Sequence, residues 1–213
     1  FKAKFVLESA IKVDTGANGG GSSRFFDRAA WVGLEGAYGE LRLGRIDSSI
    51  GLLAGNSAIL GAQAYDDLKI AKTFAGDTYR RVDNAITYVL PTLAAGVSGS
   101  ELADTDEGKA FGLNVQYAAG PFGAGLGFIN AAESDEEDDQ GVLVYASYDF
   151  GAAKLTGYYN QDDRDSEDEK RSLYGIKVGI PFSTNFSLTA GVSKVSNVNF
   201  VKDADATIIA IKG

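Results

Sequence analysis

The sequence predicts an all-β chain, a transmembrane antiparallel β-barrel, and three observations support this prediction. Apolar and polar residues alternate with a period of two in successive short segments. The links between those segments alternate strictly between long and short. No segment approaches the ~20 consecutive apolar residues of a transmembrane helix, whereas a barrel strand needs only every second residue to be apolar.

Twelve segments show the alternation and are predicted to be strands. They are residues 1–9, 24–36, 39–47, 79–90, 94–100, 109–117, 122–129, 141–150, 153–160, 172–181, 186–195 and 204–212. The segment 110–117 is typical, because one face is apolar and the other is polar or small. The two faces are Phe111, Leu113, Val115 and Tyr117 against Gly112, Asn114 and Gln116.

The links predict which strand ends lie together. The short links are residues 37–38, 91–93, 118–121, 151–152 and 182–185, and most carry the Gly, Pro, Asn or Ser of tight turns. The long links are residues 10–23, 48–78, 101–108, 130–140, 161–171 and 196–203. Short turns at one end and long loops at the other are the plan of an outer-membrane barrel.

Alternation alone does not say which face of the sheet meets water, so a soluble, carbohydrate-binding β-sandwich is an alternative. The barrel is favoured because the link lengths keep their parity and because aromatic residues recur at strand ends, as in interfacial girdles. These aromatic residues are Phe26, Tyr38, Phe122, Phe150, Phe182 and Phe186.

The composition argues against catalysis. The chain has no histidine and no cysteine, which removes the usual general base, the usual metal ligands and the His-dependent nucleophilic arrangements. We therefore expect no enzyme activity, cofactor or metal site. The acidic runs 133–139 and 162–169 are expected to be solvated loop tips, with calcium binding as a weaker alternative. Basic residues do not cluster with aromatic ones, so no nucleic-acid partner is expected.

Residues 24–47 carry a family resemblance. An F-x-R-x-A-x-V-G-L strand (Phe26 to Leu34) is followed after a short turn by G-x-L-x-L-G-R (Gly39 to Arg45). The chain resembles the general porins of neisserial and β-proteobacterial type. Further similar segments are Leu7-Glu8, residues 81–88 before Pro91, and residues 175–183 with their Pro-Phe-Ser turn.

The resemblance implies a sixteen-stranded barrel that assembles as a homotrimer in the bacterial outer membrane, in contact with lipid and lipopolysaccharide. Residues 1–213 would be a single porin domain, with residues 48–78 as a constriction loop folded into the lumen. Residues 1–9 would be the third strand and residues 204–212 the fourteenth, so we expect a mature or cut segment that lacks two strands at each end. An open sheet would otherwise leave unpaired edges in lipid.

The implied function is passive diffusion of small hydrophilic solutes and ions through a water-filled pore. A substrate-selective channel of the same fold is the alternative. Selectivity in such a pore depends on its width and on the charged side chains that line it.

Side-chain parity selects the charged residues expected to line the pore. They are Lys2, Lys4, Glu8, Glu40, Arg42, Arg81, Asp83 and Lys177, with Lys154 by the same rule. Arg45 shares parity with the apolar Leu41 and Leu43, so it either reaches out of the lipid or is turned toward the constriction by a strand-end bulge.

Within the expected constriction loop, a mixed-charge segment could oppose this basic wall and create a transverse field. Its charged residues are Asp66, Asp67, Lys69 and Lys72. The alternative is an exposed helical turn with Asp-Lys pairs three residues apart.

The net charge of −9 conceals an uneven distribution. The links 101–108, 130–140 and 161–170 hold 16 of the 29 acidic and 2 of the 20 basic residues, so the rest of the chain holds 13 acidic and 18 basic residues. Because the barrel part is net basic, we expect a weak to moderate preference for anions.

Overall fold

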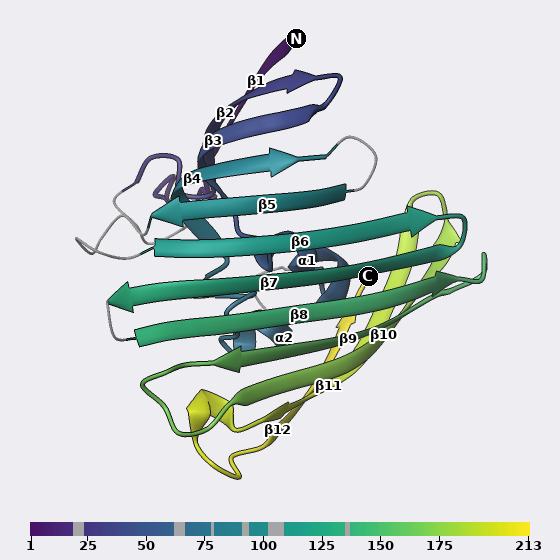
Figure 1. The fold of residues 1–213 in the computed structure, drawn as a ribbon. Helices are drawn as coiled ribbons and strands as arrows, with labels where there is room; N and C mark the ends of the chain where they lie inside the picture. Colours follow the sequence, from purple (N-terminus) through teal and green to yellow (C-terminus); the bar gives the residue numbers. More distant parts are fainter. Residues whose placement is uncertain (19–23, 62–66, 78, 91–93, 102–108, 135–136) are drawn as a thin grey trace.

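The chain folds into one curved antiparallel sheet of twelve strands, each paired with its neighbours in sequence order (Figure 1). This computed structural model describes residues 1–18, 24–61, 67–77, 79–90, 94–101, 109–134 and 137–213. The strands are β1 Lys2–Glu8, β2 Ala29–Gly36, β3 Gly39–Asp47, β4 Arg81–Val89, β5 Ala94–Glu101, β6 Lys109–Ala119, β7 Phe122–Ser134, β8 Glu137–Asp149, β9 Lys154–Asp163, β10 Arg171–Ser183, β11 Phe186–Ser196 and β12 Ala206–Lys212.

All twelve predicted strands are present, but several predicted boundaries are wrong. The predicted strand 24–36 begins only at Ala29. The predicted link 130–140 is largely strand, because β7 continues to Ser134 and β8 begins at Glu137, and the predicted link 161–171 is shortened, because β9 continues to Asp163. These strand ends are polar and carry no period-two signal, yet their backbone groups continue the ladder. Several acidic residues assigned to loops therefore belong to the sheet.

The apolar face of the sheet is the exposed one. Along β6, Phe111 and Leu113 are exposed whereas Ala110 and Asn114 are buried, and Asn114 retains only 3% exposure. The same holds on β1, where Phe5 is 72% exposed. A soluble sandwich would bury this face between two sheets, so the sandwich alternative is wrong.

Aromatic residues gather at the ends of the strands that meet in short turns. The ring centroids of Phe122 and Tyr148 lie 4.7 Å apart, and those of Tyr148 and Phe150 lie 4.6 Å apart. Phe182 and Phe186 flank the β10–β11 turn with their centroids at 5.7 Å. Their exposure at one rim matches the expected girdle.

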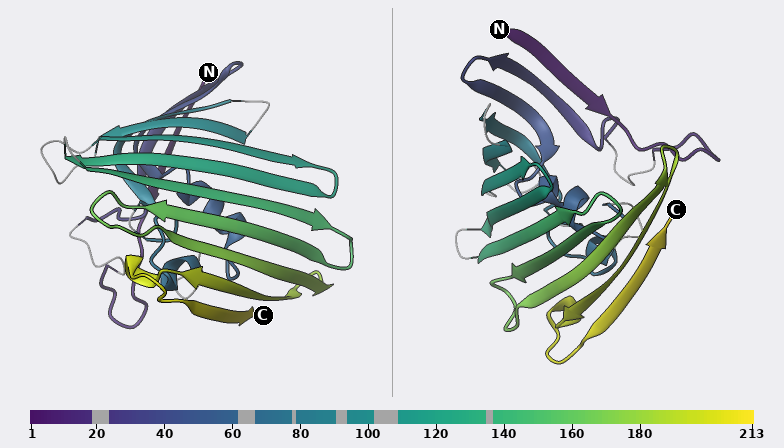
Figure 2. Two further views of the ribbon diagram at one scale, coloured as in Figure 1. Left: turned by 60° about the horizontal axis from the view of Figure 1, so that its bottom comes forward. Right: turned by 90° about the vertical axis from the view of Figure 1, so that its right-hand side faces the viewer.

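The buried core lies between the concave face of the sheet and residues 48–78, here called the inward segment. This segment leaves β3, forms α1 (Gly51–Ser57) and α2 (Asp67–Ile70), and returns to β4. Figure 2 shows both helices on the concave side of the sheet. A short 3₁₀ helix, η1 (Val198–Phe200), lies between β11 and β12. Among the described residues, no helix has both the length and the apolar composition needed to cross a membrane.

Apolar side chains hold the inward segment against the sheet. Ile50, Leu53, Leu68 and Phe74 are fully buried in the same cluster as residues of the concave wall. The wall residues of this cluster with at most 1% exposure are Ile129, Ala131, Leu143, Leu173 and Val195. The core is thus built by a folded-in connection and not by a second sheet.

Gly44 allows β2 and β3 to pair closely, so we expect its replacement by a larger residue to lower the stability of the fold. Its φ is +133°, and an added Cβ would overlap the carbonyl oxygen of Ala30 and lie 2.9 Å from the Cα of Trp31. We expect Gly44→Ala to destabilise the fold by about 1–3 kcal/mol, because it combines a strained backbone with overlap. The measurement is the temperature at which the folded band is lost on unboiled SDS gels. Gly157→Ala is the control, since its Cβ would meet nothing within 4 Å, and equal shifts for both variants would contradict the prediction.

Candidate pore lining

A cluster of alternating charges lies on the concave face of β1, β2 and β3. Strand pairing places Lys4 opposite Gly33 and Gly33 opposite Arg42, so the two basic side chains share a face. Glu40 lies between them. It accepts hydrogen bonds from Arg42 Nε at 2.9 Å and Nη2 at 3.1 Å, and from Lys4 Nζ at 3.2 Å. The Arg42 guanidinium also stacks 4.7 Å from the Trp31 ring centroid.

Two further charges extend this β1–β3 charge cluster. Lys2 lies 3.6 Å from Glu35, and Lys4 also forms an ion pair with Glu35. The cluster therefore holds the basic residues Lys2, Lys4 and Arg42 against the acidic residues Glu35 and Glu40. Its net charge is positive, and four of the predicted lining residues belong to it.

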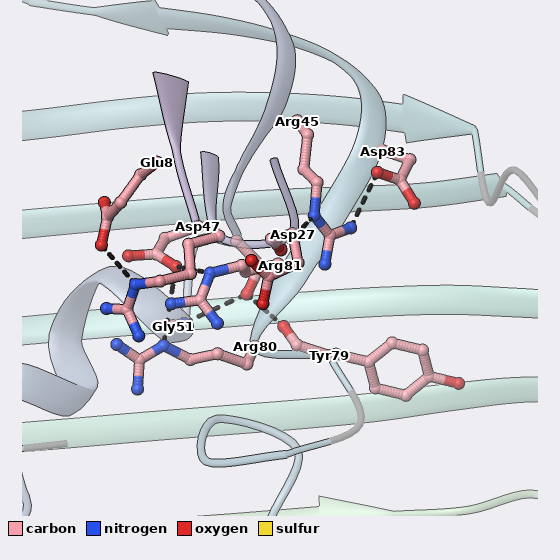
Figure 3. A network of polar contacts seen from close by, with 11 residues as sticks. Glu8, Asp27, Arg45, Asp47, Gly51, Tyr79, Arg80, Arg81 and Asp83 are labelled. Carbon is pink, nitrogen blue, oxygen red and sulfur yellow. Dashed lines mark hydrogen bonds and ion pairs between the residues drawn. The ribbon is translucent and has the colours of Figure 1, made fainter. Parts of the chain in front are cut away.

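Arginine residues gather at the long-link end of strands β1 to β4 (Figure 3). Arg81 Nε lies 3.1 Å and Arg80 Nε 3.6 Å from Asp47 Oδ1, beside the start of α1. Arg28 forms an ion pair with Glu8. Nearby, Arg45 and Arg24 bind the two oxygens of Asp83, at 2.7 and 2.9 Å.

Sequence reasoning found only part of this arginine cluster. Arg45 and Arg81 were expected at the pore, whereas Arg24, Arg28 and Arg80 were not. Two signals were available: Arg80 is adjacent to Arg81, and Arg28 is the arginine of the F-x-R-x-A segment. Arg24 precedes β2 in an irregular segment, where no parity rule applies.

A β-bulge breaks the alternation on which the placement of Arg81 and Asp83 depends. Gly44 pairs with Ala85 but Ile46 pairs with Val82, so β4 has one extra residue opposite Arg45. Asn84 adopts the left-handed region at φ +50°, which asparagine tolerates better than most residues. Val82 is buried on the concave face. The unbroken alternation that assigned its neighbours Arg81 and Asp83 to the lumen therefore does not hold.

Arg45 does not extend into apolar surroundings, although it stays in register with Ala30. Its Nε donates to the Asp27 carbonyl at 2.8 Å, and Nη1 donates to Asp83 at 2.7 Å. A bulge is present here, but its extra residue is on β4 and Arg45 keeps its register with β2, so it is not the expected bulge that would turn Arg45 toward the constriction.

The inward segment is attached to the wall by polar contacts as well as by its apolar core. Phe74 N donates to Asp162 Oδ2 at 3.1 Å, and Asp162 is held by Arg171 at 2.8 Å. Tyr79 Oη donates to Asp139 Oδ2 at 2.8 Å. These acidic residues fall in runs that were expected to be solvated loop tips, and both are buried, so that expectation is wrong for them.

Asp67 is an anchor of the inward segment and does not face the pore. It has no exposed surface and accepts hydrogen bonds from Ile59 N at 3.0 Å and Tyr158 Oη at 2.5 Å. The expectation that Asp67 opposes the basic wall is therefore wrong. Lys69 forms an ion pair with Asp77. The alternative of Asp-Lys pairing three residues apart would join Lys69 to Asp66, which lies outside the described residues.

Lys72 and Asp66 are the other charged residues expected in the inward segment. Lys72 adopts φ +52° after α2, and Asp66 lies outside the described residues. The described residues contain no group of three or more acidic side chains placed to hold a metal ion.

Lys177 belongs to a second basic region on the concave face, formed by β9, β10 and β12. Its Nζ donates to the Ala58 carbonyl at 2.6 Å, just after α1. Lys154 and Lys212 line the same cavity. Basic side chains thus lie on two separate parts of the concave wall.

Comparisons with known proteins agree with this architecture. The family model described as "Gram-negative porin" matches residues 1–213. Outer membrane porin protein 32 of Delftia acidovorans is 30% identical over 222 residues, which cover 94% of this chain and 58% of the relative. The chain therefore spans less than two thirds of that protein's length.

Two solved structures share the fold. An anion-selective porin from Comamonas acidovorans superimposes with a TM-score of 0.79 at 26% identity, over 98% of this chain and 68% of that chain. OmpF of Salmonella typhi, solved with daunomycin, has a TM-score of 0.60 at 17% identity over 86% of this chain and 64% of its own. A match to a family model along the whole sequence, a curved sheet with an apolar outer face and a folded-in segment lead to one conclusion: the chain belongs to the Gram-negative porin family.

Proposed function

We propose that the chain forms the wall of an outer-membrane diffusion pore for small hydrophilic solutes and ions, with a preference for anions. The observation that carries this proposal is the orientation of the sheet. Its apolar side chains point outward, and its polar and charged side chains point to the concave face. An apolar outer face suits lipid, and a polar inner face suits a water-filled lumen.

The inward segment is proposed to narrow this lumen. It lies on the concave side, and its buried apolar and polar contacts bind it to β7, β8, β9 and β10. A segment held in this way would set the width of the pore, while the side chains around it would set the charge preference.

The preference for anions is supported by the described lining. The β1–β3 charge cluster is net positive, and the second basic region adds Lys154, Lys177 and Lys212. The structurally similar Comamonas protein is titled an anion-selective porin. Assembly as a trimer, contact with lipopolysaccharide and the absence of catalysis are parts of the same proposal.

Reversal potentials test this function directly. The natural full-length protein carrying this chain is inserted into planar bilayers with a salt gradient across them. We expect stepwise conductance increases and a reversal potential of the sign that chloride selectivity produces, because the lining is net basic. Conductance without ion preference, or with cation preference, would contradict the anion part, and a lack of conductance steps would contradict the channel itself.

A further inference from the structure

A cavity of about 260 Å³ lies between the inward segment and the concave face of β9 to β12. Gly55, Asn56 and Gly61 line one side of it. Lys154, Lys177 and Lys212 line the other side, together with Thr156 and Thr189. This lysine pocket is separate from the β1–β3 charge cluster, because it is built from the last four strands.

Strand pairing explains why three lysines from distant positions meet here. Lys154 pairs with Gly179, Gly179 with Thr189, and Thr189 with Lys212, so these residues form one row across four strands. At roughly 4.8 Å per strand step, the two outer lysines of this row start about 14 Å apart. Gly179 has no side chain between them, so their long side chains can extend over it into the cavity.

The third lysine, Lys177, lies two residues before Gly179 and pairs with Thr156. Its ammonium group donates to the Ala58 carbonyl at 2.6 Å. The pocket is therefore connected directly to the inward segment.

Two of the three lysines of the pocket carry a charge that no described carboxylate neutralises. Within the described parts of the chain, no carboxylate forms an ion pair with Lys154 or Lys212. The nearest acidic residue by register is Asp149, the strand partner of Lys154. Its Oδ1 accepts a hydrogen bond from Gly151 N at 2.7 Å, within the adjoining turn.

We propose that the lysine pocket is a second anion-binding site, selective for small oxyanions such as inorganic phosphate over chloride. Several ammonium donors and two threonine hydroxyls in one cavity suit a ligand with several acceptor oxygens, whereas chloride is a single monovalent acceptor. Charge-assisted hydrogen bonds from lysine to phosphate are the strong class of such contacts. The inference rests on the proposed function, because the site meets solute only if the lumen is filled with water.

The pocket lies toward the short turns. Lys154 is the first residue of β9, directly after the turn at residues 151–152, and Lys212 is the last residue of β12. A solute that enters from the side of the long links would reach this pocket after passing the inward segment. The site would hold oxyanions briefly near the short turns and slow the flow of chloride.

Phosphate binding is measured by calorimetry on the full-length protein in detergent, at fixed ionic strength set with chloride. We expect saturable binding, and a loss of affinity of about tenfold for Lys154→Gln, because one charge-assisted contact is removed. Lys202→Gln removes the same charge from an exposed loop position and is expected to bind phosphate as the unmodified protein does. In bilayers, phosphate should reduce chloride current through the unmodified channel more than through the Lys154→Gln channel.

Two outcomes overturn the inference while leaving the proposed function intact: conducting channels without saturable phosphate binding, and equal affinities for the Lys154→Gln and Lys202→Gln proteins. Lys177→Gln serves as a second variant, since it also weakens the link to Ala58. Binding that is unaffected in both pocket variants would place the bound phosphate elsewhere and would also overturn the inference. If no conductance is found at all, it is the proposed function that fails.

Discussion

Asp162→Ala is expected to release the inward segment from the wall, with a large loss of stability and a wider pore. Asp162 has no exposed surface, and the side chain of its ion-pair partner Arg171 is only 3% exposed. Removing one member of a buried ion pair leaves the other charge without compensation, which costs about 3–5 kcal/mol. The Phe74 amide and the Asn160 side chain lose an acceptor at the same time.

The effect should reach the pore because of what Arg171 and Phe74 contact. The Arg171 guanidinium lies 4.5 Å from the ring centroid of Phe200 and 5.8 Å from that of Phe74. Phe74 is fully buried in the core that holds the inward segment. Loss of Asp162 therefore disturbs the anchor between this segment and β9 and β10. We expect a lower midpoint of thermal unfolding and a larger, noisier single-channel conductance.

Asp163→Ala is a closely matched control for this experiment. It removes the same group from the neighbouring residue of β9, where Asp163 pairs with the exposed Lys170 at 2.6 Å. An exposed pair of this kind contributes about 0–1 kcal/mol. Equal midpoints and conductances for the two variants would show that the buried pair does not anchor the inward segment.

Arg42→Glu is expected to give the largest change in ion preference among single substitutions of the β1–β3 charge cluster. It changes the local charge by two and places a second carboxylate beside Glu40, which makes the cluster net negative. Because a pore with low-dielectric walls focuses the field of the charged groups that line it, the anion-to-cation permeability ratio should fall by about tenfold. The measurement is the reversal potential in a salt gradient.

Lys202→Glu makes the same change of charge on an exposed loop and should leave the reversal potential unchanged. Arg42 also stacks on Trp31, so retention of the folded, heat-modifiable band must accompany the Arg42→Glu measurement. A folded Arg42→Glu channel with unaltered ion preference would show that the β1–β3 charge cluster does not determine ion selectivity.

The strands and their faces could be predicted because they depend on local pattern. Period-two alternation assigns Phe111 and Leu113 to one face and Asn114 to the other, whatever the rest of the chain does. The same rule failed at Arg81 and Asp83, where the extra residue in β4 shifts the register by one. A one-residue shift exchanges the two faces of a strand, and the sequence carries no mark that distinguishes Asn84 from other strand residues.

Side chains of the inward segment were harder to predict, because their roles depend on partners far away in the sequence. Asp67 looked like a charge available to the pore, but it accepts a hydrogen bond from Tyr158, 91 residues later. Asp139 and Asp162 looked like solvated loop residues, but Asp162 binds Phe74 of the inward segment and Asp139 binds Tyr79, the residue after it. A buried carboxylate requires hydrogen-bond donors, and those donors are supplied only when the segment folds onto the wall.

The sequence by itself determined the all-β class, the order of the twelve strands and the division of each strand into an apolar and a polar face, since each follows from local alternation. Which face points outward was decided by the fold. The tertiary structure alone decided the anchoring of the inward segment, the gathering of the arginines at the ends of β1 to β4, and the lysine pocket. The physical reason is that these features join residues brought together by sheet curvature and strand register. Neither quantity is encoded in any single segment of the chain.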